Sequence, residues 1–167
     1  MPIKGIESMI EVSKRLKNEF PDWEWHIYGN GDAAYVQKLQ NEIDENDLGS
    51  FLKLMGGTNN IYECYRNCGL FVLSSHSEGF SMVLLEAKAN RVPLISFDCP
   101  TGPRNIIRDG VDGYLVPCED TDALHDKIFQ CISDEELRRT LSENAYGNMD
   151  KFSRNEIIKS WMRYIGE

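Results

Sequence analysis

The sequence has more acidic than basic residues and no long apolar run, and its first residues do not have the pattern of a signal peptide. Its 167 residues carry a formal net charge of −9, which argues against nucleic acid or an anionic membrane surface as the main partner, because both require a basic face. No run of about 18 apolar residues is present, so we expect no transmembrane helix. The first residues lack the apolar core of a signal peptide, which favours a cytoplasmic protein.

The cysteines do not suggest disulfide bonds either. The five cysteines are odd in number, and their spacing resembles no disulfide framework, so a reducing cytosol is the simpler interpretation. Cys64 and Cys68 lie one turn apart on a predicted helix. A zinc site needs four ligands at a recognisable spacing, and the others are absent. We therefore expect no metal site, and we expect Cys64 and Cys68 to be half-buried residues of the helix.

The length suits a single domain covering residues 1–167. Apolar residues at helical spacing begin at Ile3, Ile6 and Ile10, almost at the first residue. An α/β domain normally begins with a strand. We therefore expect the chain to be a piece of a longer protein.

Short apolar runs alternate with amphipathic segments along the chain. Strands are predicted at 24–28, 50–55, 70–73, 92–97 and 113–117, and helices at 5–20, 33–46, 60–67, 81–90, before 110, and at 121–133, 135–148 and 155–165. This rhythm indicates an α/β fold with a doubly wound, Rossmann-like parallel sheet. Such sheets bind ligands at the carboxyl ends of their strands.

The loop from Ser74 to Phe80 follows the most apolar predicted strand and leads into a helix. The free amides and positive dipole end of a helix N-terminus suit a phosphate. Gly79 allows close approach of the backbone, and Ser81 is a candidate N-cap.

Two acidic residues flank this candidate phosphate site. Glu78 precedes the predicted helix and Glu86 lies inside it. A carboxylate repels phosphate, so both are better suited to accept hydrogen bonds from hydroxyls, as a sugar nucleotide would offer. From the residues alone, an ordinary surface loop whose acids favour the helix dipole explains the pattern equally well.

Longer motifs surround these two glutamates, which are separated by seven residues. They are Glu-Gly-Phe-Ser at 78–81, Leu-Glu-Ala-Lys-Ala-Asn-Arg-Val-Pro-Leu-Ile at 85–95, and Ile-Arg-Asp-Gly-Val-Asp-Gly-Tyr-Leu-Val-Pro at 107–117. Together they resemble the glutamate-seven-glutamate signature of retaining GT-B glycosyltransferases, family 4 in particular. The resemblance covers nearly the whole chain. It implies the C-terminal, donor-binding half of a GT-B fold, with the N-terminal acceptor domain absent.

The resemblance also implies roles for individual residues. Glu78 would contact hydroxyls of the donor sugar, which makes it the candidate catalytic residue, and Glu86 would bind the ribose. The backbone of Phe80, Ser81 and Met82, with Gly79 before them, would hold the pyrophosphate. Lys4 would neutralise donor phosphate, and Gly29 and Gly31 resemble a G-x-G that passes close to the donor. A plain strand-end turn is the alternative for these two glycines.

The segment before Lys4 departs from the family pattern, whereas the segment at 98–103 resembles one branch of the family. The family pairs the lysine with an arginine a few residues earlier, which this sequence lacks, so we expect weakened donor binding. At 98–103 the sequence reads Asp-Cys-Pro-Thr-Gly-Pro, which resembles the branch that builds bacterial surface polysaccharides, usually from UDP-sugars. Arg104 either adds positive charge near the donor or is solvated. The resemblance implies no metal or other cofactor.

These observations predict part of a retaining glycosyltransferase that moves a sugar from a UDP-sugar to a hydroxyl acceptor, the fragment alone being inactive. Its partners would be the donor and the missing N-terminal half, through which the enzyme could sit at the inner face of the membrane. The alternatives are a complete non-catalytic subunit that docks a partner carrying the acceptor half, and a flavodoxin-like signalling domain, for which Asp98 is thin support.

Two further residues or segments carry expectations that the structure can test. The C-terminal apolar face around Trp161 and Tyr164 either crosses to another domain or packs on its own sheet. His125 lies in an acidic region and is expected to be solvated.

Overall fold

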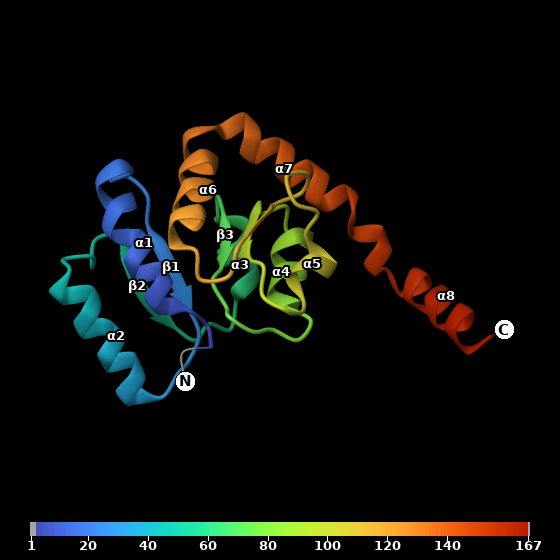
Figure 1. The fold of residues 1–167 in the computed structure, drawn as a ribbon, viewed down its shortest axis with the longest axis horizontal. Coiled ribbons are helices and arrows are strands. Elements are labelled where there is room, and N and C mark those ends of the chain that lie inside the picture. The colour runs from blue at the N-terminus through green and yellow to red at the C-terminus, as the bar shows by residue number, and fades with distance from the viewer. Residues whose placement is uncertain (1–2, 167) are drawn as a thin grey trace.

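A computed structural model describes residues 3–166, so the outermost ends of the expected 1–167 domain lie outside the described residues. Helices and strands alternate along the chain, as the sequence predicts (Figure 1). The elements in chain order are α1 (Ile6–Glu19), β1 (Trp25–Tyr28), α2 (Ala33–Glu45), β2 (Leu52–Gly56), α3 (Ile61–Arg66), β3 (Phe71–Leu73), α4 (Met82–Ala89), β4 (Leu94–Phe97), α5 (Pro103–Ile106), β5 (Tyr114–Val116), α6 (Thr121–Ser133), α7 (Glu135–Gly147), the 3-10 helix η1 (Met149–Phe152) and α8 (Arg154–Ile165).

All the strand pairs in the described residues are parallel, which confirms the α/β class. They form two hydrogen-bonded groups, β1-β2 and β3-β4-β5. Some strands are shorter than predicted. The run at 92–97 becomes a strand only at Leu94, because Pro93 has no N–H to donate; its carbonyl still accepts a 2.9 Å bond from the Phe71 amide.

Helices cover both faces of the sheet. Along β4, Ile95 and Phe97 belong to one hydrophobic cluster and Leu94 to the other, as the two-residue period of a strand requires. The first cluster contains buried residues of α1, α2 and α6, and the second contains residues of α3, α4 and α5. Each fully buried Leu or Ile contributes roughly 1.5–3 kcal/mol to the stability of the fold. A hydrophobic cluster on each face of the strands is the arrangement of a doubly wound fold.

The predicted solvation of His125 is wrong. Its side chain is only 5% exposed, with Nε2 2.7 Å from a Glu19 oxygen and Nδ1 3.0 Å from an Asp126 oxygen. The acidic neighbours are present as expected, but α6 packs against α1 and brings Glu19 over the ring from a distant part of the sequence. His125 is therefore a partnered residue of the α1–α6 interface.

The C-terminal helix α8 extends away from the rest of the chain (Figure 1). None of its residues is buried, and Trp161 is 62% and Ile165 63% exposed. Of the two expectations for this helix, packing on its own sheet is therefore wrong for the described residues.

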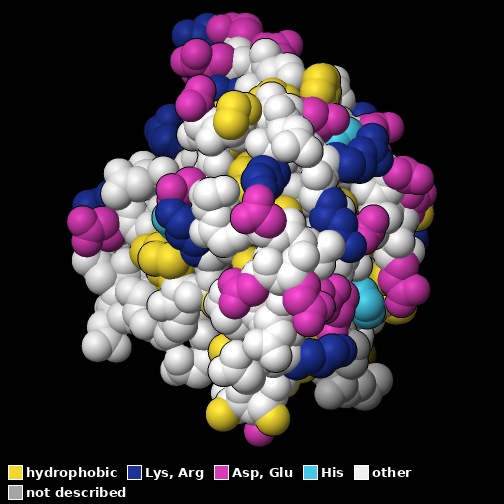
Figure 2. Space-filling model, turned by 90° about the vertical axis from the view of Figure 1, so that its left-hand side faces the viewer, with side chains coloured by type: hydrophobic (Ala, Val, Ile, Leu, Met, Phe, Trp, Pro, Cys, Tyr) yellow, Lys and Arg dark blue, Asp and Glu magenta, His cyan; other side chains and the backbone are white. Residues whose placement is uncertain are grey.

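The surface that carries α1 and α2 mixes acidic and basic side chains (Figure 2). Pairs such as Lys14–Glu11 and Lys17–Asp47 lie at 2.8 and 2.7 Å. Among residues 3–166, no helix has both the length and the apolar character needed to cross a membrane.

Candidate functional site

The segment before α1 lies against the carboxyl end of β3. The Ile3 carbonyl accepts a 2.8 Å bond from the His76 amide, and the Ser74 hydroxyl donates to the Lys4 carbonyl at 2.9 Å. Gly5 has φ +61°, and a Cβ there would lie 1.9 Å from the Ser74 carbonyl oxygen. Only glycine fits this contact. The packing therefore places the N-terminus of α1 beside the loop that carries Glu78.

Lys4 and Glu78 form an ion pair across this contact. Lys4 Nζ lies 2.8 Å from Glu78 Oε1, with side-chain exposures of 65% and 11%. Burial alone would raise the pKa of Glu78, but the Lys4 ammonium and the nearby Ser75 hydroxyl outweigh it and hold the pKa below the ordinary value. Glu78 is therefore an ionised acceptor beside a cation that remains open to solvent.

The loop before α5 forms the second wall of the site. The Thr101 hydroxyl donates to the Glu78 carbonyl. Gly102 has φ +94°, and a Cβ there would lie 2.9 Å from both the Gly79 carbonyl oxygen and the Ser81 hydroxyl oxygen. The sequence Thr101-Gly102 thus supports the turn that leads into α4.

Helix α4 begins at this turn, and its first amides have no partner within the helix. Ser81 is at the N-cap position, as expected, but its side chain makes no capping hydrogen bond. The Leu84 amide bonds to the Ser81 carbonyl at 2.9 Å, so the amides of Met82 and Val83 are the ones that remain available to a ligand.

Unpaired polar atoms gather in the same loop. Among the described residues, four buried side-chain polar atoms lack a hydrogen-bond partner, and three belong to Ser75, His76 and Ser81. The Ser75 hydroxyl lies close enough to affect the Glu78 carboxylate but outside hydrogen-bonding geometry. Buried polar groups in folded proteins are nearly always paired with protein or water. Three such groups in one loop leave hydrogen-bonding capacity there that a polar ligand or water can use.

Glu86 lies one turn inside α4 and is already oriented by a neighbour. The Tyr65 hydroxyl donates to Glu86 Oε2 at 3.2 Å. Tyr65 is 4% exposed, and its burial, followed by the nearby Glu86 charge, raises the pKa of its hydroxyl. The other oxygen of Glu86 can accept a further hydroxyl. The sequence analysis did not identify Tyr65 as a site residue. The only signal available was an aromatic hydroxyl on the predicted helix before β3.

The loop is open on one side. Phe80 is 47% and Met82 59% exposed, and the Phe80 ring lies 6.2 Å, centroid to centroid, from Phe152 of η1. Surface hollows of about 480 and 490 Å³ occur elsewhere, lined by polar residues in and beside α2 and α3, and neither includes Glu78. The exposed Phe80 and Met82 thus leave one side of the candidate site open to solvent.

Gly29 and Gly31 lie at the carboxyl end of β1, which pairs with β2 in the other hydrogen-bonded group. The Gly29 amide donates to the Gly56 carbonyl at 2.8 Å, its φ is +145°, and a Cβ on Gly57 would meet the Asn30 side chain. These contacts join the two strand-end loops to each other. They do not join Gly29 or Gly31 to Glu78.

Arg104 pairs with Asp98 through both ends of its guanidinium, at 2.5 and 2.6 Å. The Asp98 hydrogen bonds raise the pKa of Arg104, whose side chain is 71% exposed. Arg104 is therefore paired with an acid rather than unpaired in solvent, and Asp98 belongs to no metal-binding group of acids, cysteines or histidines among the described residues.

The structure thus brings Lys4, Glu78, Gly79 and Ser81 together, with Phe80, Met82 and Glu86 following on α4. The arrangement is that of an α/β domain with a polar binding site at the carboxyl ends of parallel strands.

The chain belongs to the glycosyl transferases group 1 family, which it matches over residues 2–148. It is 33% identical over 168 aligned residues to an exopolysaccharide phosphotransferase of Streptomyces coelicolor, covering 100% of this chain and 18% of that protein. TarM from S. aureus, solved as a variant in complex with UDP, is 27% identical with a TM-score of 0.90, covering 100% of this chain and 34% of TarM.

A third relative is similar over most of its solved length. The C-terminal domain of a glycosyl transferase group 1 protein from Francisella tularensis is 27% identical with a TM-score of 0.80, covering 90% of this chain and 80% of that domain. The expected family and the C-terminal half of a GT-B fold are therefore confirmed. The chain spans 18% of the first of these curated relatives.

Proposed function

We propose that this chain is the donor-binding domain of a retaining glycosyltransferase that moves a sugar from a UDP-sugar to a hydroxyl acceptor in surface polysaccharide or glycan synthesis. One observation carries the proposal: unpaired Ser75, His76 and Ser81 atoms lie beside the Lys4–Glu78 pair, between the N-termini of α1 and α4. The UDP bound to the similar TarM supports the choice of nucleotide.

The charges of the site suit a sugar nucleotide. Two helix N-termini and the Lys4 ammonium would face the diphosphate and stabilise the leaving group, without a metal being part of the proposal. The Glu78 carboxylate would accept hydrogen bonds from hydroxyls of the sugar, and the free oxygen of Glu86 would accept one from the ribose. Lys4 would then lie between Glu78 and a donor phosphate.

We further propose that the 167-residue chain binds its donor weakly and transfers no sugar. Phe80 and Met82 leave the site open, and an open site removes less of a ligand from water than an enclosed one. The acceptor-binding half would come from the preceding part of the full protein, in the cytoplasm or at the inner face of the membrane. The exposed apolar face of α8 would dock there. Measurable transfer by the isolated chain would contradict this proposal.

A calorimetric titration of UDP, GDP and several UDP-sugars tests the donor assignment. Glu86→Ala should weaken every ribose-containing ligand, whereas Glu78→Ala should remove chiefly the additional affinity contributed by the sugar. Glu45→Ala, at the exposed end of α2, is the matched control and should leave every affinity unchanged. Equal losses of bare UDP affinity in the Glu78 and Glu86 variants would contradict these roles.

A further inference from the structure

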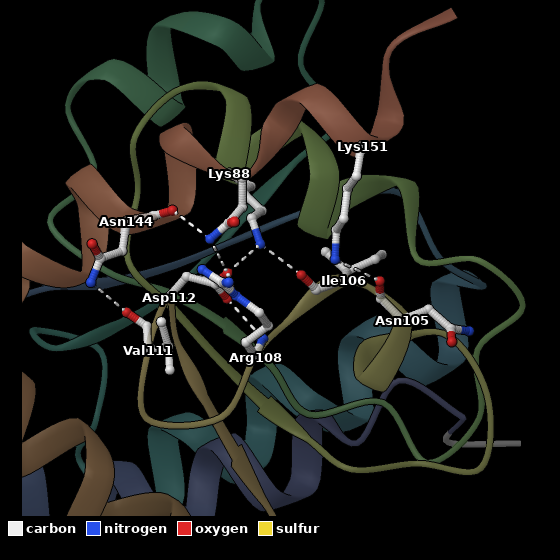
Figure 3. Close-up of polar contacts among 9 residues, drawn as sticks. Lys88, Asn105, Ile106, Arg108, Val111, Asp112, Asn144 and Lys151 are labelled. Atoms are coloured by element: carbon white, nitrogen blue, oxygen red, sulfur yellow. Dashed lines mark hydrogen bonds and ion pairs between the residues drawn. The ribbon is translucent and has the colours of Figure 1, made fainter. Parts of the chain in front are cut away.

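Helix α4 carries a lysine that is fully buried. Lys88 lies two residues after Glu86, and its side chain and that of Asp112 are both 0% exposed. Lys88 Nζ is 3.0 Å from Asp112 Oδ2 and donates to the Ile106 carbonyl at 2.6 Å (Figure 3). Removing two charges from water costs several kcal/mol per ion. The position therefore requires an explanation other than simple core filling.

Asp112 collects donors from three separate segments. Besides Lys88 of α4, the Arg108 backbone amide donates to it at 2.8 Å and the Arg108 guanidinium at 3.1 Å (Figure 3). The side-chain amide of Asn148, the residue that follows α7, donates to it at 3.0 Å. One carboxylate thus joins α4, the turn before β5 and the end of α7. Both carboxylate oxygens of Asp112 therefore accept hydrogen bonds.

The surrounding contacts hold the same segments in place. The Asn144 side chain donates to the Val111 carbonyl at 2.9 Å, and Lys151 of η1 donates to the Asn105 carbonyl at 3.3 Å (Figure 3). The segment from α7 to η1 therefore bonds to the α5–β5 region through exposed side chains, whereas Lys88 bonds to the same region in the core.

Helices α4 and α5 are consequently joined at both ends. At the start of α4, Gly102 lies against Gly79 and Ser81. Near the end of α4, Lys88 bonds to the carbonyl of Ile106, the last residue of α5. A rotation or shift of α4 along its axis would break the contacts at both ends.

An apolar residue would fill the position of Lys88 at lower desolvation cost. Leu84, one turn earlier on the same face, is 0% exposed. Burial lowers the pKa of Lys88, and the Asp112 carboxylate offsets this only in part. Apolar replacements of buried ion pairs are often equally or more stable, so the pair is better explained by directional bonds that select one arrangement of α4.

We propose that Lys88 is a positioning residue of the donor site: together with Asp112 it fixes the rotation and axial position of α4. It thereby places the Glu86 carboxylate and the amides of Phe80, Ser81 and Met82. The donor part of this inference rests on the proposed function, whereas the positioning of α4 can be measured without any ligand.

The test compares Lys88→Met, Asp112→Asn and the double variant, with Lys38→Met on exposed α2 as control. Lys88→Met should lower Tm by on the order of 10 °C, because it leaves Asp112 buried without its main cation. The double variant should recover part of that loss. Its UDP affinity, measured well below its Tm, should still be at least tenfold weaker than that of the wild type.

Hydrogen exchange in the ligand-free proteins separates this inference from the proposed function. The amides of 84–90, which are hydrogen-bonded in α4 and at its end, should exchange at least tenfold faster in the double variant, while those of α1 and α6 keep their wild-type rates. A wild type that does not bind UDP contradicts the proposed function but leaves this readout intact. A folded double variant with wild-type exchange at 84–90 would overturn the positioning role.

Discussion

At the scale of single residues, the site depends on Lys4, whose ammonium can pair with the Glu78 carboxylate and with a phosphate of the proposed donor. Lys4 contacts Glu78 at 2.8 Å and remains 65% exposed, so a donor phosphate can approach it from solvent. An exposed ammonium held by a largely buried carboxylate keeps its position at little entropic cost on binding. Lys4 is therefore both the support of Glu78 and a positive side chain that the site offers to phosphate.

The Lys4–Glu78 pair predicts a specific pH dependence of stability. Because the folded pKa of Glu78 is lowered, the pair stabilises the fold above the ordinary glutamate pKa of about 4.3. That contribution is lost as the pH falls through the lowered folded pKa. In Lys4→Met the ammonium no longer opposes burial, so the folded pKa of Glu78 rises toward or above that of the unfolded chain. The variant should therefore be less stable than the wild type near pH 7, but it should lose less stability as the pH falls.

Urea unfolding between about pH 3 and 7 measures this shift. The effect on the free energy of unfolding should be at most about 1 kcal/mol, since Lys4 is solvent-exposed. Lys14→Met removes an exposed Lys14–Glu11 pair and serves as control, with little change. Superimposable profiles for wild type and Lys4→Met would contradict the role assigned to the pair.

At the scale of elements, the turn into α4 depends on close backbone contact with the loop before α5. Gly102→Ala should therefore strain both, since its φ is +94° and the new Cβ would lie 2.9 Å from Gly79 and Ser81. We expect a loss of about 1–3 kcal/mol in stability together with weaker UDP binding. Thermal unfolding and calorimetry measure the two effects.

Gly49→Ala is the matched control, because a Cβ there meets nothing within 4 Å and its φ is not positive. It should leave stability within about 0.5 kcal/mol of wild type and should not affect UDP binding. If Gly102→Ala behaves like Gly49→Ala, the loop before α5 does not support the site.

The sequence predicts the local features of these elements well. The alternation of strands and helices, the start of α4 and the spacing of Glu78 and Glu86 all follow from short-range patterns. What it does not predict are partners brought together by tertiary packing. Tyr65 reaches Glu86, Glu19 covers His125, and Asp112 meets Lys88. Each partner lies on a different element, and no local period shows which elements pack together.

One signal for Lys88 was nevertheless available. It lies four residues after Leu84, on the face of α4 that the helical period predicts to be buried. A buried lysine requires an anionic or carbonyl partner, and Asp112 is one of the acids in the turn that follows α5. The residue type and its face thus indicate a buried pair, although the sequence does not identify the partner.

At the scale of the whole molecule, the described chain is a packed α/β body with one helix outside it. Helix α8 has no buried residue, while its Ile157, Trp161 and Ile165 are spaced by four residues and 46–63% exposed. An apolar stripe of this kind is typical of an interaction face. The chain covers 34% of TarM, and under the proposed function this face would dock on the remainder of the full protein.

Removal of residues 154–167 should therefore leave the body intact. We expect the free energy of unfolding to change by less than about 1 kcal/mol, because no buried contact is lost. By contrast, Leu141→Ala in α7, where the side chain is 1% exposed, should cost about 2–5 kcal/mol. Urea unfolding compares the two. A truncated chain as unstable as the Leu141 variant would show that α8 contributes to the core.

The most direct test of the donor site is a UDP titration of the isotopically labelled chain followed by NMR. The largest amide shifts should fall at Gly5 and Ile6, at the start of α1, and at residues 75–86, while α2 and α8 remain unchanged. Saturating shifts confined to these two segments are the result we expect. Shifts centred on α2 or α3, or none at millimolar UDP, would contradict the account.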